Sequence, residues 1–217
     1  RTTLPIPPAP FDGVIAPDVA NSRPMPVQPV RAPAGAPNVL LFMSDDVGFA
    51  MSSAFGGPVP TPNFERLAAM GQRYNRFHTT GICSPSRAAL LTGLMPARNG
   101  AEANHSKPRA EIRKLPAYLK DLGYEVVSFG KVSHYQHTGD YGFDHFAHDK
   151  FHEDIAVSAA ISWLRARRDP RPLCLFVGTN WPHVPWPATG EGYEADAVKV
   201  PANHVDTPRT REARATY

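Results

Sequence analysis

Side chains able to do chemistry occur in four clusters of the sequence, each where α/β proteins build binding sites. Three clusters follow short apolar runs, and the fourth stands at a predicted helix start. The clusters are Asp45 with Asp46, Lys131 with His134, His183 within Asn180-Trp181-Pro182-His183, and Cys83-Ser84-Pro85-Ser86-Arg87. Ligands of open parallel sheets bind beyond the carboxyl ends of the strands. We therefore expect the clusters to converge on one rim of a sheet.

Asp45 and Asp46 are the candidates for a metal site. Adjacent carboxylates repel each other unless a cation or hydrogen-bond donors neutralise them, and their oxygens suit Ca²⁺ or Mg²⁺. The alternative is a pair of acids that caps a helix or closes a turn. The spacing leaves both interpretations open.

Cys83 and Arg87 lie four residues apart, one turn along the same helix face. Their chemistry suggests a thiolate activated by the arginine and the helix end, and the alternative is a buried cysteine with a surface arginine. Lys131 offers an ammonium that can bind an anion, and His134 and His183 offer acid–base groups. Each of these three, taken alone, is more often structural or solvated than catalytic. The spacing assigns no role to other histidines such as His105.

The composition excludes several classes of protein. The chain has 217 residues, 42% of them hydrophobic and 20% charged, which suits one sizeable core or two small ones. A net charge of +3 is too small to indicate a nucleic-acid partner. No run approaches the roughly 20 apolar residues of a membrane span. The two cysteines make no disulfide framework, and Cys174 is expected to be a buried thiol.

Apolar runs and capping signals predict alternating strands and helices from residue 38 onward. Buried strands are expected at 39–43, 125–129 and 173–177, and a short strand at 73–78. Helices are expected from Thr61-Pro62, Ser84-Pro85 and Leu115-Pro116, from 207 onward, and around an apolar face of Val157, Ala160, Ile161 and Leu164. This order predicts an α/β fold with a mostly parallel sheet and helices on both faces. Residues 1–37 contain ten of the 24 prolines and are predicted to form an extended arm.

Five segments resemble motifs of the sulfatases, the formylglycine-dependent branch of the alkaline phosphatase superfamily. Cys83 to Gly93 resembles the sulfatase signature, whose Cys-x-Pro-x-Arg core is read by the formylglycine-generating enzyme. The others are 37–48, like the opening strand and metal pair; 61–68, like the next helix; 130–134, like the Gly-Lys-x-His segment; and 181–186, like the Pro-His loop. Gly130-Lys131-Val132-Ser133-His134 has one extra residue, a spacing similar to that of iduronate-2-sulfatase. The resemblance covers about residues 37–217.

The resemblance implies a sulfuric ester hydrolase and a role for each cluster. Cys83 becomes formylglycine (3-oxoalanine), whose hydrated gem-diol attacks sulfur with one oxygen and expels sulfate with the other. Asp45, Asp46 and the modified Cys83 hold Ca²⁺ or Mg²⁺. Arg87 orients the diol. Lys131 and His183 bind sulfate oxygens, His183 protonates the leaving oxygen, and His134 accepts the proton when the diol collapses.

The resemblance also implies the surroundings of the enzyme. The substrate is a sulfated carbohydrate or other small molecule such as an aryl sulfate, the maturing enzyme is a partner, and the location is periplasmic or secreted. The family's further metal pair and sulfate-binding lysine are not found after His183. Residues 38–217 are therefore expected to be the N-terminal part of a truncated catalytic domain with an incomplete fold. The competing hypotheses are a phosphonate or phosphate monoester hydrolase of the same superfamily and a non-catalytic binding protein with this fold.

Overall fold

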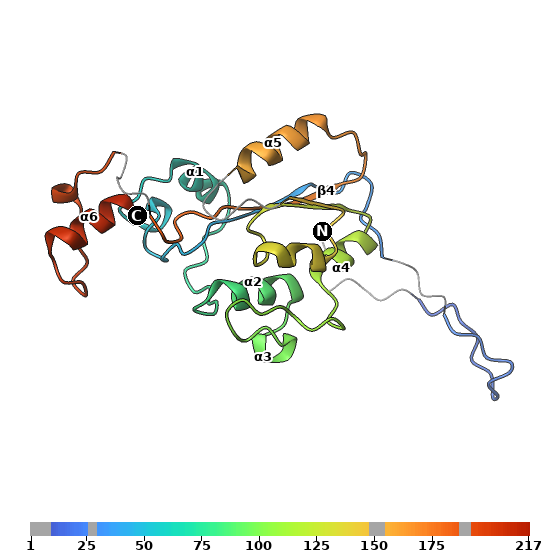
Figure 1. Cartoon of the computed structure of the whole chain (residues 1–217). Helices are drawn as coiled ribbons and strands as arrows, with labels where there is room; N and C mark the ends of the chain where they lie inside the picture. The colour runs from blue at the N-terminus through green and yellow to red at the C-terminus, as the bar shows by residue number, and fades with distance from the viewer. Residues whose placement is uncertain (1–9, 26–29, 148–154, 187–191) are drawn as a thin grey trace.

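The computed structural model describes residues 10–25, 30–147, 155–186 and 192–217 (Figure 1). Strands and helices alternate along much of this length, and short 3-10 helices are marked η. The elements are β1 (Val39–Met43), η1 (Ser53–Phe55), α1 (Pro62–Met70), α2 (Cys83–Thr92), α3 (Pro96–Asn99), α4 (Leu115–Asp121), β2 (Glu125–Gly130), η2 (Tyr135–Tyr141), β3 (His145–Ala147), α5 (Ala156–Ala166), β4 (Leu173–Gly178), η3 (Ala195–Ala197) and α6 (Pro208–Thr216).

The four strands form one parallel sheet in the order β1-β4-β2-β3. Their register fixes where the strands end. Met43 of β1 pairs with Gly178 of β4, which in turn pairs with Gly130 of β2. The carboxyl ends of three strands therefore lie at one level of the sheet, and the segments that follow them leave from the same rim.

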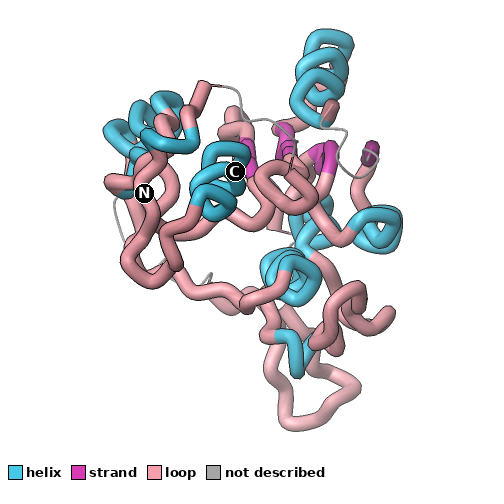
Figure 2. The backbone as a smooth tube through the Cα atoms, turned by 60° about the vertical axis from the view of Figure 1, so that its left-hand side comes forward, coloured by secondary structure: helices cyan, strands magenta, loops and turns pink. Residues whose placement is uncertain are grey.

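Helices cover both faces of the sheet, as Figures 1 and 2 show for α5 on one side and α2 on the other. Alternate residues of a strand point to opposite faces, so β2 and β4 contribute side chains to two hydrophobic cores, one on each face of the sheet. One core joins Val126, Cys174 and Phe176 to Leu91 of α2 and to the apolar residues of α4, and the other joins Val127, Leu175 and Val177 to Ala156 and Ala160 of α5. The predicted α/β class, the parallel sheet and the helices on both faces are confirmed.

The prediction that 39–43 is a buried strand is only half right. The strand forms, but β1 is an edge strand of the described sheet, and Leu40 is 67% exposed and Phe42 43% exposed. An apolar run shows that a segment can be buried on both faces. It does not show whether the strand stands at the centre or the edge of the sheet.

The predicted face of α5 is wrong, although the helix is confirmed. Ala160 is buried, but Val157, Ile161 and Leu164 are 41% to 43% exposed. The helix instead packs on the sheet through Ala156 and Ala160, helped by the partly buried Trp163. The helix carries two apolar stripes, and the one made of alanines allows the closer approach to the strands.

Other differences concern short elements. Residues 73–78 form no strand. The helix expected from Ser84-Pro85 begins one residue earlier, so that Cys83 is its first residue. The short elements α3 and β3 carried no recognisable pattern in the sequence.

The described part of the proline-rich arm contains neither helix nor strand. Residues 10–25 form a loop closed by one antiparallel bridge between Val14 and Arg23, and this loop projects away from the sheet (Figure 1). The arm meets the body where the Ala32 amide donates to the Leu122 carbonyl. A domain boundary at residue 37 stays a prediction, and residues 1–9 and 26–29 lie outside the described part. None of the helices in the described ranges is long and apolar enough to cross a membrane.

Candidate active site

Backbone hydrogen bonds join the three segments that leave the strand ends. The Thr179 amide donates to the Met43 carbonyl at 2.9 Å, and the Lys131 amide donates to Gly178 at 2.8 Å. The Asp45 amide donates to the Trp181 carbonyl at 3.2 Å. The ladder of the sheet thus continues past the strands. As the sequence predicted, the segments carrying Asp45, Lys131 and His183 start from one rim.

Glycine is required where β2 meets β4. Gly130 has φ = 72°, in the left-handed region, and a Cβ atom there would overlap the Gly178 carbonyl oxygen. A Cβ on Gly178 would in turn overlap the Lys131 backbone. Only glycine accepts both the dihedral angle and the close approach. The two glycines let the chain turn sharply, which brings Lys131 back over the rim.

Asp45 is the centre of a buried network of charges. Its carboxylate is 2% exposed and accepts from Arg87 Nη2 at 3.0 Å on one oxygen and from Lys131 Nζ on the other. Arg87 also donates to the Lys131 carbonyl and, at 3.4 Å, to the Val132 carbonyl. The alternative of a surface arginine is wrong, because Arg87 is 6% exposed. One helix and two strand ends are therefore locked together by one carboxylate and two cations.

This network predicts that replacing Asp45 destabilises the protein much more than replacing its neighbour Asp46. Asp45→Asn leaves two buried cations without a counter-charge, so we expect a loss of about 3–5 kcal/mol in the free energy of unfolding. Asp46 is about half exposed, and Asp46→Asn is the matched control, expected to change stability by less than about 1 kcal/mol. Denaturant unfolding of the whole protein in a metal chelator measures both. Equal losses would contradict the central position of Asp45.

Asp45, Asp46 and His183 form a candidate metal site. One ligand atom from each lies within 4.8 Å of the others, and His183 Nε2 is 3.6 Å from an Asp46 carboxylate oxygen. Two carboxylates and an imidazole are a suitable donor set for a divalent cation. The sequence-based ligand set was Asp45, Asp46 and the modified Cys83. The structure adds His183 to the pair, and Cys83 is not part of this group.

Cys83 opens onto a pocket of about 420 Å³ beside this group. The pocket is bordered by the start of α2, the loop after α3, the segment after β2 and the loop after β4. Its lining residues are Cys83, Asn104, His105, His134, Tyr135 and His183. Cys83 is half-buried, and Ile82 before it offers the helix no side-chain cap. Three of the predicted catalytic residues, Cys83, His134 and His183, therefore share one pocket.

His134 is held in its neutral form. It is 5% exposed, and its ring lies edge-on to His105 at 4.7 Å and to Tyr135 at 4.3 Å between ring centroids. Burial, followed by the electrostatic influence of His105 and of the Lys131 ammonium, lowers the pKa of His134 from 6.5 to about 4. A histidine that is neutral at neutral pH can accept a proton, which suits the predicted role.

The lowered pKa of His134 predicts a pH-dependent stability. In the unfolded chain His134 becomes protonated near pH 6.5, whereas in the folded chain it stays neutral until the pH falls to about 4. The contribution of neutral His134 to the free energy of unfolding is therefore complete above pH 6.5 and is lost as the pH falls to 4. His134→Asn should flatten the slope of unfolding free energy in that window. The exposed His78→Asn serves as the control, and equal slopes in the two variants would contradict the assignment.

Sequence reasoning missed His105, Asn104 and Tyr135 as lining residues. No spacing rule pointed to them, because Asn104 and His105 lie in an irregular loop and Tyr135 begins the short 3-10 helix η2. The backbone gives a signal that the sequence lacks. Asp46, His105 and Tyr135 are the non-glycine residues of the described chain with positive φ, at 62°, 61° and 48°. All three border the candidate site, where strained backbone is often found.

The fold is a parallel α/β sheet with carboxylates, cationic groups, histidines and a cysteine gathered at one rim, and comparison with known proteins names the family. A family model described as Sulfatase matches residues 37–207. The chain is 32% identical over 154 residues to an ulvan-active sulfatase of Formosa agariphila, covering 68% of this chain and 30% of that protein. It is 29% identical over 182 residues to an N-acetylglucosamine-6-O-sulfatase of Bacteroides thetaiotaomicron, covering 73% and 33%.

The fold is also that of solved sulfatases. The structure of BT4656 in complex with its substrate D-glucosamine-2-N,6-O-disulfate matches with a TM-score of 0.60 and 25% identity, covering 70% of this chain and 36% of that one. The chain therefore belongs to the sulfatase family. It spans about a third of the length of the relatives and of this neighbour, as the coverages of 30%, 33% and 36% state.

Proposed function

We propose that the whole protein hydrolyses sulfuric esters and that Cys83, matured to formylglycine, supplies the nucleophile. The observation that carries the proposal is the meeting of Cys83, His134 and His183 in one pocket next to the Asp45 network. A sulfate ester needs a nucleophile, fixed positive charge on its oxygens and a proton donor for the leaving group. The rim offers candidates for all three.

Each residue has a role that its position supports. The start of α2 favours an anion beside Cys83, because first-turn amides and the helix dipole point there. Lys131 contributes an ammonium, which lies between Asp45 and the Tyr135 ring, 4.7 Å from the ring centroid. Arg87 holds Asp45 and Lys131 in place. His183 protonates the leaving oxygen, and neutral His134 takes up a proton in the second half of the reaction.

Asp45 and Asp46, with His183 or the matured Cys83 beside them, would hold Ca²⁺ or Mg²⁺. The cation supplies a positive charge that polarises the sulfate oxygens. Further ligands can come from other parts of the whole protein. The donor set favours a hard divalent cation over a soft one, because carboxylate oxygens dominate it.

We also propose that the substrate is a sulfated carbohydrate. Support comes from the relatives, which are named an ulvan-active sulfatase and an N-acetylglucosamine-6-O-sulfatase, and from the neighbour solved with D-glucosamine-2-N,6-O-disulfate. The maturing enzyme belongs to the same proposal, because formylglycine has to be made from Cys83 before the protein can act. A periplasmic or secreted location is proposed with it.

Turnover of three matched aryl esters tests the proposed function. The whole protein, matured at Cys83, is assayed with an aryl sulfate, an aryl phosphate and an aryl phosphonate. The proposal expects the aryl sulfate to be the best substrate. A preference for phosphate or phosphonate would replace it with the monoester hydrolase hypothesis, and no turnover of any ester by matured protein would favour a binding protein.

A further inference from the structure

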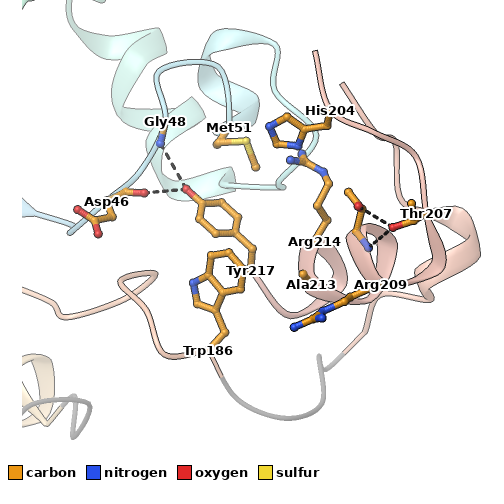
Figure 3. A pocket seen from close by; sticks show the side chains of 11 residues that line it. Asp46, Gly48, Met51, Trp186, His204, Thr207, Arg209, Ala213, Arg214 and Tyr217 are labelled. Atoms are coloured by element: carbon orange, nitrogen blue, oxygen red, sulfur yellow. Dashed lines mark hydrogen bonds between the residues drawn. The ribbon is translucent and has the colours of Figure 1, made fainter. Parts of the chain in front are cut away.

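A second pocket, of about 620 Å³, adjoins the candidate metal site through Asp46 (Figure 3). The carboxylate of Asp46 is 3.6 Å from His183 Nε2, on the catalytic side. Its backbone carbonyl accepts from the Tyr217 hydroxyl at 2.8 Å, and Tyr217 lines the second pocket. A ligand that reached the catalytic rim would therefore have this pocket directly beside it.

The pocket carries unbalanced positive charge. Arg209, Arg214 and His204 line it, and Asp46 is the one acid among its described lining residues. The Asp46 carboxylate is about half exposed and lies 3.6 Å from His183 Nε2. Two guanidinium groups therefore border a space that has one carboxylate among its described lining residues.

The hydrogen bonds of Arg209 and Arg214 differ from those of Arg211, a third arginine of α6. Arg211 is committed to Asp206, with both of its contacts at 2.6 Å, and does not line the pocket. Among the described residues, Arg214 donates only to a neutral carbonyl, that of Lys199, at 3.2 Å. Arg209 makes no ion pair within the described ranges. One planar guanidinium group binds two sulfate or carboxylate oxygens at once, so each of these two arginines suits an anion.

Flat aromatic rings form another wall of the pocket. The Trp186 indole donates to the Pro182 carbonyl at 2.8 Å, which fixes its ring, and the Tyr217 ring meets it edge-on, at 84° between the ring planes and 5.4 Å between the centroids. Such rings offer a broad surface to the apolar face of a sugar. The volume lies within the range of small-ligand sites.

We propose that this pocket binds a second anionic substituent, a sulfate or a carboxylate, of a sulfated sugar whose reacting sulfate lies at Cys83. The Arg214 guanidinium lies beside His204 and the Arg209 guanidinium lies at the other end of the pocket (Figure 3), so one of the two pairs with that substituent, and Trp186 supports the sugar ring. The inference rests on the proposed function and narrows its substrate class to sugars with at least two negative groups. It makes the pocket a specificity site and gives it no part in breaking the ester bond.

Binding to the whole protein carrying Cys83→Ala tests the proposal without turnover. Calorimetry compares two matched pairs of sugars: N-acetylglucosamine 6-sulfate with glucosamine-2-N,6-O-disulfate, and N-acetylgalactosamine 4-sulfate with its 4,6-disulfate. In at least one pair we expect the disulfate to bind about 10- to 100-fold more tightly, the effect of a charge-assisted contact. One of the two variants Arg209→Ala and Arg214→Ala should remove most of that preference, because one of the two guanidinium groups holds the second substituent. Arg165→Ala, an exposed arginine of α5 outside the pocket, should keep it.

The outcomes distinguish this proposal from the proposed function. Equal affinity within both pairs, or a preference that survives in both arginine variants, overturns the second anionic site even if aryl sulfate is hydrolysed. Absence of aryl sulfate turnover by the matured protein overturns the proposed function, whatever the sugars do. Trp186→Ala adds a separate check, because it should weaken both members of a pair alike and leave their ratio unchanged.

Discussion

Cys83→Ala in the whole protein should reduce turnover of sulfate esters by about 10⁶-fold, the order seen when a covalent nucleophile is removed. The alanine keeps the helix start and removes the sulfur that maturation converts. Cys83 lines the pocket with His134 and His183 and is the one cysteine among its described lining residues, so no other thiol there can be matured in its place. Cys83→Ser should be equally inactive unless a serine-converting maturation system is present. Steady-state rates on an aryl sulfate measure both losses.

The second cysteine provides the control for this prediction. Cys174 on β4 is 2% exposed, and burial raises the pKa of its thiol to about 11, so it stays protonated and unreactive. Cys174→Ala should retain most of the activity at a temperature where the variant is folded. Activity that persists in Cys83→Ala and disappears in folded Cys174→Ala would contradict the assignment.

Replacing each of the two site histidines by alanine should slow a different step of the reaction. His183→Ala and His134→Ala should each lower kcat by about 10²–10⁴-fold, the usual contribution of a positioned acid or base. The His183 variant should be hurt less on esters with good leaving groups, because such a departing oxygen needs little protonation. The His134 variant should instead accumulate sulfated protein, because its step follows the attack on sulfur.

Leaving-group series and mass spectrometry separate these two outcomes. A plot of log kcat against leaving-group pKa should be steeper for His183→Ala than for the exposed control His78→Ala. A mass increase by one sulfate on the Cys83 peptide should appear in His134→Ala only. The same leaving-group slope in every variant, together with no sulfated peptide, would return both histidines to a structural role.

Much of the fold followed from local patterns in the sequence. The strand Leu173–Gly178 and the helix that Gly93 ends are set by apolar runs, capping and a left-handed glycine. What failed depends on tertiary packing. The exposure of Leu40 depends on which strands lie beside β1, and the choice between the two stripes of α5 depends on how closely it approaches the sheet. The short β3 strand, His145–Ala147, has too few residues for a period to show.

The candidate site shows the same division. Three polar clusters were predictable because each directly follows a strand, and the register of the strands brings them to one rim. The partners were not predictable. Arg87 pairs with Asp45 across 42 residues, and Lys131 pairs with Asp45 across 86. No local sequence pattern can predict contacts at such separations. His105 reaches the pocket through an irregular loop at φ = 61°, which periodicity does not detect.

The mass of the peptide that contains Cys83 tests the central claim most directly. The whole protein is expressed with a competent formylglycine-generating enzyme, digested and examined with its Cys174 peptide as the internal reference. The account predicts that the Cys83 peptide loses sulfur and gains a carbonyl oxygen, while the Cys174 peptide keeps its thiol. An unmodified Cys83 thiol in protein that hydrolyses sulfate esters at full rate would contradict the account.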